Sequence, residues 1–221
     1  YELAESCAWV MAQAGKVDQA LDLLERNRPV YNLGPWSLAL MPHWDFLRDN
    51  PRFRALAAQG EAASQVYDLM RQAALSANFD QALEHGKRLI GEFGDSAYGS
   101  FAALELAKLA YQRGEKSVAR DHLRWVVDTA PDAAIREVAR LRLGGLLLDM
   151  NELQALESLL AATPQPAFTG EFSALRGDLE LIKGNPQAAR DAYRQALTQG
   201  VGDEALLRMK LVDAGGEADN S

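Results

Sequence analysis

The side chains most often used in enzyme chemistry and metal binding are few in this sequence and far apart. They are His43, His85, His122 and Cys7. A metal site needs several such ligands at short spacings, and a nucleophilic site needs a cysteine or serine with a histidine beside it. The patterns HExxH, GxSxG and the phosphate-binding loop do not occur, so we expect no catalysis, no metal and no cofactor. The pair Gly144-Gly145 precedes leucines, which indicates helices that cross closely.

Two of these residues are expected to serve the fold. Cys7 lies in an alanine-rich segment, where a small apolar side chain is usually buried. His122 precedes Leu123 on the apolar side of an expected helix, in the core or beside a groove. With no catalytic group in view, function must come from the surface that the secondary structure builds.

Composition and charge narrow the kind of partner. The 221 residues are 48% hydrophobic and 24% charged, as in a folded globular protein, and the net charge is −8. An acidic surface repels phosphate backbones, which argues against nucleic acid as a partner. The sequence starts at Tyr1, so we expect the natural N-terminus to be absent; there is no signal peptide and no apolar run of the roughly 18 residues a membrane span needs.

The stretch from Ser100 to Pro131 predicts two amphipathic helices joined at Gly114, a residue suited to a tight turn. Apolar and small residues recur at helical spacing on both sides of the glycine, at Phe101, Leu104, Ala107, Tyr111, Ala119, Leu123 and Val126. An alanine in the place of Ala119 recurs at Ala20, Ala82, Ala155 and Ala189. The last three intervals are 37, 36 and 34 residues, which indicates a repeated helical hairpin.

Further hairpins are predicted at 1–28, 62–94, 133–163 and 167–200, followed by a last helix from Glu204 to Ala214 that Asp203 can cap. Residues 29–59 interrupt the pattern with prolines and tryptophans, including Trp36 and Trp44. Here we predict a loop, a short helix at 36–41, a turn at 43–50 and a helix starting at Pro51. The fold class is therefore all-α.

The Ser100–Pro131 stretch resembles a tetratricopeptide repeat (TPR). The residues that carry this resemblance are Leu106, Ala107, Tyr111, Gly114, Ala119, Leu123 and Pro131. The resemblance implies a TPR-like solenoid of helical hairpins, wound as a right-handed superhelix and closed by a capping C-terminal helix.

Residues from about 61 to 214 resemble a narrower group, the ancillary SecYEG translocon subunit family (YfgM-like proteins). The phrases that carry this are DSAYGSFAALELAK at 95–108, HLRWVVDTA at 122–130, ARLRLGGLLL at 139–148, LRGDLELIKGNPQAARDAYRQAL at 175–197 and LLRMKLVDA at 206–214. The family implies an inner-membrane protein with one N-terminal span and a periplasmic TPR domain that associates with the translocon and with periplasmic chaperones.

The N-terminal part departs from that family. The phrase PHWDFLRDNPRF at 42–53 resembles the segment that closes TPR arrays in some bacterial signalling proteins. We therefore divide the chain into a TPR unit with a closing segment (1–60), a TPR-like domain of about four repeats with a cap helix (61–214) and a disordered tail (215–221). The junction is expected at Gln59-Gly60-Glu61.

The expected interaction surface follows from the repeat. In a TPR superhelix, the first helix of each hairpin lines the concave face. The residue twelve positions before the repeated alanine lies in this helix, and its neighbours about one turn away are expected to face the groove. The predicted partner-binding residues are Tyr67, Arg71, Phe101, Lys108, Tyr111, Glu137, Arg140 and Asp178. Aromatic and arginine side chains are common on peptide-binding surfaces. Phe101 and Tyr111 could equally belong to the core, and the cations to a solvated face.

Two classes of function follow. The first is a non-catalytic scaffold at the periplasmic face of the inner membrane that binds translocon subunits, chaperones or their clients, as the resemblance implies. The second, based on residues 1–59, is a cytoplasmic TPR adaptor or the regulatory domain of a signalling enzyme of the cyclase or kinase type.

Overall fold

The computed structural model describes residues 2–27 and 42–216 of the chain, and within these ranges every regular element is a helix. The α-helices are α1 (Glu2–Gln13), α2 (Val17–Asn27), α4 (Pro51–Leu75), α5 (Phe79–Phe93), α6 (Ala97–Gln112), α7 (Lys116–Thr129), α8 (Ala133–Asp149), α9 (Leu153–Leu160), α10 (Thr169–Ile182), α11 (Pro186–Gln199) and α12 (Glu204–Asp213). Two short 3-10 helices, η2 (Pro42–Leu47) and η3 (Pro166–Phe168), join them.

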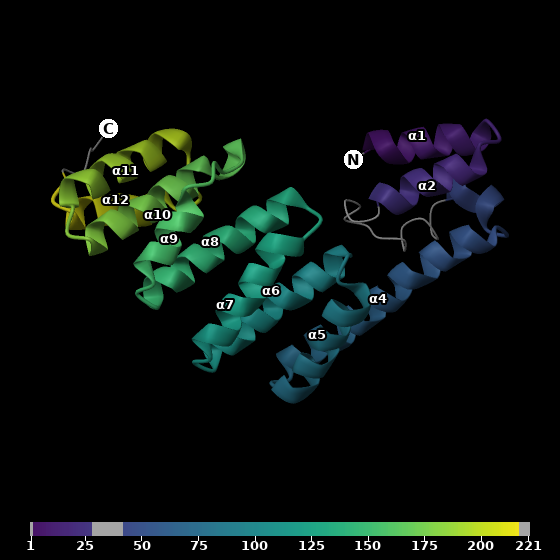
Figure 1. Ribbon diagram of the computed structural model, residues 1–221, viewed down its shortest axis with the longest axis horizontal. Coiled ribbons are helices and arrows are strands. Elements are labelled where there is room, and N and C mark those ends of the chain that lie inside the picture. Colours follow the sequence, from purple (N-terminus) through teal and green to yellow (C-terminus); the bar gives the residue numbers. More distant parts are fainter. Residues whose placement is uncertain (1, 28–41, 217–221) are drawn as a thin grey trace.

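Neighbouring helices pack as hairpins that follow one another along the molecule (Figure 1). The pairs are α1–α2, α4–α5, α6–α7, α8–α9 and α10–α11, and α12 packs on α11 at the C-terminal end. The predicted all-α stack of hairpins with a last helix is confirmed. Because each hairpin buries its apolar face against its neighbours, the core is a chain of linked clusters rather than one centre.

The same turn closes the hairpins from α4 to α11. Each turn contains a residue with positive φ. The N–H of the next residue donates a hydrogen bond to the carbonyl five positions earlier in the chain, and these donors are Asn78, Glu115, Glu152 and Asn185. The positive-φ residue is a glycine at Gly114 and Gly184, whereas Ala77 and Asn151 adopt a positive φ although they carry a Cβ. This turn gives a register for comparing the hairpins.

In that register the residue equivalent to Ala119 in the fourth hairpin is Leu156, not Ala155. Ala119 lies four residues after Glu115 and Leu156 four residues after Glu152, and both are buried, whereas Ala155 is half-exposed. A leucine fits because Gly144 opposite has no side chain: a Cβ there would lie 3.3 Å from Leu156 Cδ1 and 2.3 Å from Leu175 Cδ2. The close helix crossing expected at Gly144 is present. The positions in α8 that are equivalent to those in α6 therefore lie one residue later than the alignment on Ala155 gives.

The N-terminal hairpin has its own core. Trp44 of η2 is completely buried between residues of α1, α2 and α4, and its ring centroid lies 5.9 Å from that of Phe53. Asn50 caps α4, whose start at Pro51 agrees with the prediction. The expected short helix at 36–41 lies outside the described residues.

Two N-terminal expectations differ from the structure. Cys7 is exposed, because among residues 7–13 of α1 the buried side chains are Ala8 and Ala12 and the cysteine falls beside that stripe. Residues 59–61 lie inside α4, which runs unbroken from Pro51 to Leu75, so the proposed domain junction falls within one helix.

A substitution at Gly170 should test the packing of the last hairpin. A Cβ on Gly170 would lie 1.8 Å from the carbonyl oxygen of Gly200, a backbone atom that cannot rotate away. We expect Gly170→Ala to lower the free energy of unfolding by about 1–3 kcal/mol, as overpacked sites do. The matched control is Gly202→Ala, where a Cβ meets nothing within 4 Å. Equal urea midpoints for the two variants would contradict this packing.

Candidate partner-binding groove

Three hollows lie along the surface formed by α4, α6, α8, α10 and α12, which we call the groove face. Their volumes are about 380 Å³ between α4 and α6, 490 Å³ between α6 and α8, and 290 Å³ between α8, α10 and α12. The first two share Glu105 and Lys108, so they are continuous. Equivalent repeat positions line all three, namely Arg71, Lys108, Gly145 and Asp178. The hairpin repeat therefore places two continuous hollows and a separate third one on the same face.

The first hollow, between α4 and α6, combines an aromatic wall with a cation. Tyr67 is half-buried, and its ring centroid lies 5.6 Å from that of Tyr98 and 6.1 Å from that of Phe101. Burial raises the pKa of the Tyr67 phenol, so it stays a neutral hydrogen-bonding group. Arg71 is exposed and has no ion-pair partner among the described residues. This hollow offers apolar contact beside a free guanidinium.

The middle hollow, between α6 and α8, has an apolar floor and a charged rim. The floor is formed by Leu104, Ala107, Ala119, Leu123, Gly145 and Leu146. On the rim, Lys108 pairs with Glu105 at 2.9 Å and Lys116 pairs with Asp149 at 2.8 Å. The Lys116 ammonium, together with the Tyr111 hydroxyl, lowers the pKa of the Asp149 carboxyl.

Two further rim residues of the middle hollow face solvent. Tyr111 is 49% exposed, and Arg142 is exposed without an ion-pair partner in the part of the chain that the structure describes. An exposed aromatic ring and an unpaired guanidinium beside an apolar floor are typical of surfaces that bind peptides.

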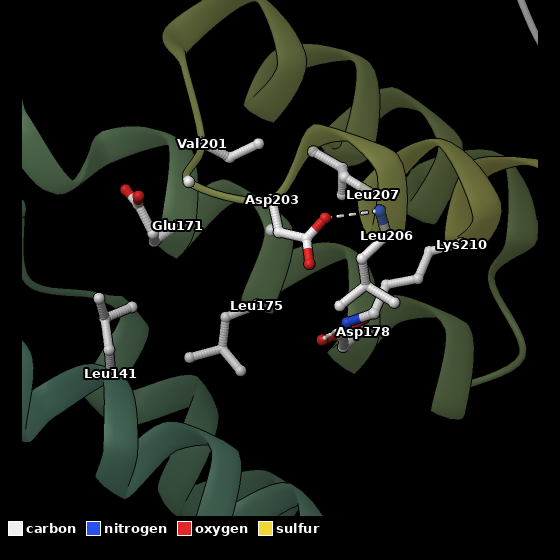
Figure 2. Close-up of a pocket in the computed structure, with 11 residues that line it drawn as sticks. Leu141, Glu171, Leu175, Asp178, Val201, Asp203, Leu206, Leu207 and Lys210 are labelled. Atoms are coloured by element: carbon white, nitrogen blue, oxygen red, sulfur yellow. Dashed lines mark hydrogen bonds and ion pairs between the residues drawn. The ribbon is translucent and has the colours of Figure 1, made fainter.

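The third hollow is lined by more acidic than basic side chains, unlike the other two (Figure 2). Its apolar wall includes Leu141 and Leu175, and its carboxylates are those of Glu171, Asp178 and Asp203. Lys210 neutralises Asp178 at 2.7 Å, and the Tyr193 hydroxyl donates to the same carboxylate at 2.8 Å. Asp203 accepts from the Leu206 N–H at 2.9 Å and so caps α12. One oxygen of Glu171 is buried with no hydrogen-bond partner among the described residues.

Most predicted partner-binding residues lie on the groove face. Tyr67 and Arg71 line the first hollow, Lys108 lines two, and Tyr111 lines the middle one. Asp178 lines the third hollow but is held by Lys210 and Tyr193. Phe101 is half-buried and supports the Tyr67 ring instead of lining a hollow.

The structure places Glu137 and Arg140 in the interior and not on the groove face. They are only 7% and 9% exposed and form a buried pair in which both contacts are 2.9 Å or shorter. The Arg140 guanidinium also donates to the carbonyls of Leu159 and Ala162 and lies 4.5 Å from the Phe172 ring centroid. They join α8 to the end of α9 and to α10, and so are unavailable to a partner.

Gly145 was missed because the positions in α8 were referred to Ala155, and the turn residue Asn151 fixes the register of this hairpin independently of the alanine. Arg142 was missed for another reason: its equivalent in α6 is Glu105, a position that was not selected in any hairpin. His122 lines none of these hollows; it is half-buried, and burial lowers its pKa.

The described residues hold neither a metal-binding cluster nor a membrane-spanning helix. In residues 2–27 and 42–216, no group of three His, Cys, Asp or Glu side chains is placed to hold a metal ion. Across the same ranges, no helix has both the length and the apolar character needed to cross a bilayer.

Comparison with known proteins places the chain. The family model described as tetratricopeptide repeat-like domain matches residues 54–216. Three relatives are each named ancillary SecYEG translocon subunit. That of Aggregatibacter actinomycetemcomitans is 27% identical and aligns over 66% of this chain and 78% of its own length. That of Haemophilus influenzae is 26% identical (70% and 76%), and that of Neisseria gonorrhoeae is 28% identical (72% and 77%).

A solved tetratricopeptide repeat protein from Parabacteroides merdae aligns with 98% of this chain and 84% of its own, at 15% identity and a TM-score of 0.49. The family match at 54–216 spans well over half of the 221 residues and covers the hairpins that build the groove face. The chain therefore belongs to the tetratricopeptide repeat-like domain family.

Proposed function

We propose that this chain is a non-catalytic scaffold that holds protein partners along its groove face, beside the Sec translocon. The observation that carries this is the row of three hollows on equivalent repeat positions, in which apolar side chains lie beside Arg71 and Arg142, two cations with no ion-pair partner among the described residues. Repeated clefts on rigid helices suit an extended partner segment. The name shared by the relatives supports the translocon as the setting.

The proposed location is the periplasmic face of the bacterial inner membrane, where translocon subunits, chaperones and newly exported chains would be available as partners. This location rests on the relatives' common name. Catalysis is not part of the proposal, because the middle hollow, where an apolar floor meets exposed cations, has its two carboxylates held by Lys108 and Lys116 instead of beside a nucleophile.

Photo-crosslinking in cells tests the proposal. A photoreactive amino acid in place of Tyr111 would sit on the rim of the middle hollow, and the same group in place of Arg124 would sit on the exposed face of α7, away from the hollows. We expect Tyr111 to yield crosslinks to translocon subunits or envelope chaperones, at several times the yield from Arg124. Equal yields from the two positions, or crosslinks only to unrelated proteins, would contradict a groove-bound partner beside the translocon.

A further inference from the structure

We propose that the middle hollow, between α6 and α8, selects a partner segment in which a bulky apolar side chain stands next to an acidic residue. This inference rests on the proposed function and specifies its ligand. The apolar side chain would enter the hollow, and the carboxylate would meet Arg142 at its rim. The occupant is an extended stretch of a partner protein.

The shape of the hollow supports an apolar anchor. At about 490 Å³ it lies in the usual range of ligand pockets. Its space comes from small residues, since Ala107 and Ala119 face it and Gly145 has nothing within 4 Å of where a Cβ would lie. Leu104 and Leu146 form apolar walls around this space. A Phe- or Leu-sized side chain would bury its surface there without displacing a protein side chain.

The charge around the hollow selects the neighbouring residue. Both rim carboxylates have cations of their own, Glu105 with Lys108 and Asp149 with Lys116. Arg142 is left as the cation without an ion-pair partner among the described residues. On a chain with a net charge of −8, this is a local site of the opposite sign, and a planar guanidinium binds a carboxylate by two parallel hydrogen bonds.

The neighbouring hollows give the bound segment a direction. Towards α4, Arg71, which has no ion-pair partner within the described ranges, extends the cationic side of the groove. Towards α12, Glu171 and Asp203 leave an acidic lining even after Lys210 has neutralised Asp178. Acidic residues of a partner are therefore favoured over the first and middle hollows and repelled from the third.

The test uses three fluorescein-labelled octapeptides with the same Gly/Ser frame and central pairs Phe-Glu, Phe-Lys or Ala-Glu. Fluorescence anisotropy with the whole chain should give the tightest binding for Phe-Glu, by about tenfold over each of the others, which corresponds to about 1.4 kcal/mol. Equal affinity for the three peptides, or no binding of any of them, would overturn the proposal.

Variants separate the pocket from the charge. Gly145→Leu fills the hollow and should weaken Phe-Glu binding by about tenfold, while its control Gly91→Leu, on α5 with equally open space, should not. Arg142→Glu should shift the preference to Phe-Lys, and the control Arg124→Glu should leave Phe-Glu preferred. Unchanged binding by both Gly145→Leu and Arg142→Glu would overturn the site.

The two proposals fail in different ways. If the peptides bind without selectivity but Tyr111 still crosslinks to translocon proteins, only the proposed ligand class is wrong. Selective peptide binding without those crosslinks would leave the ligand class and remove the translocon setting.

Discussion

Replacing Arg140 by alanine is expected to lower the free energy of unfolding by about 3–5 kcal/mol, the range for breaking a buried ion pair by removal of one partner. Arg140 is 9% exposed and pairs with Glu137, which is equally buried. Its loss would leave the Glu137 carboxylate buried without its cation, and the carbonyls of Leu159 and Ala162 without their donor. The Phe172 ring would also lose the guanidinium 4.5 Å from its centroid.

Urea unfolding followed by circular dichroism measures this effect. The matched control is Arg142→Ala, which removes the same side chain two residues later on the exposed groove face and should stay within about 0.5 kcal/mol of the parent. Arg140→Lys should fall between the two, because an ammonium keeps the charge but not the forked set of donors. Equal stability of Arg140→Ala and Arg142→Ala would mean that the buried pair does not hold α8 to α9 and α10.

The hairpin architecture could be predicted because each hairpin repeats local information. Apolar residues at helical spacing fix the two helices, and the turn residue ends the first of them, as at Gly114. The last helix was expected from Glu204 to Ala214 and runs from Glu204 to Asp213. These features depend on nearby residues, so they can be recognised without the tertiary structure.

The groove face could be predicted only in part, because its residues depend on the register of each helix. In α6 the count from Ala119 found Lys108 and Tyr111, whereas in α8 the count from Ala155 was one residue out of step. A shift of one residue turns a helix face by about 100°, enough to exchange a buried residue for an exposed one. Moved by that one residue, the position assigned to Arg140 becomes Leu141, which lines the third hollow, whereas Arg142 lies at a position that was not selected in any hairpin.

The burial of Arg140 could not be foreseen from its neighbours. In the turn-based register its equivalent in α6 is Ala103, which is fully buried, so an apolar residue is the usual occupant. Arginine is tolerated because α9 ends with its carbonyls facing α8 and because Glu137 lies one turn before it. The carbonyls come from a segment about twenty residues away, and only the folded chain brings them together.

The second large effect is expected from replacing Trp44 by alanine. This change should lower the free energy of unfolding of the N-terminal hairpin by about 3–5 kcal/mol, as for other buried aromatic residues replaced by alanine. Trp44 is fully buried and packs between α2 and α4 in a cluster that includes Leu21, Leu24 and Phe53. Few direct contacts join α2 to α4 otherwise, although Arg52 pairs with Asp22 at 2.6 Å and with Glu25 at their partly exposed surface. These ion pairs lie at the partly exposed surface, so the apolar contacts of Trp44 form the buried part of this junction.

The location of that loss tests whether the N-terminal hairpin is a separate unit. Its core cluster shares no residue with the clusters of α4–α12 that begin at Ala63, so Trp44→Ala should release α1 and α2 while the groove face stays folded. In hydrogen exchange, amides of α1 and α2 should lose protection and those of α6–α8 should keep it. The control Phe46→Ala, at a side chain that is 47% exposed and stacks on Trp44 at 6.4 Å between ring centroids, should lower protection far less than Trp44→Ala. Because α4 runs unbroken through residues 59–61, the opposite result is also well defined: loss of protection along the whole chain would mean that this helix couples the two cores into one cooperative unit.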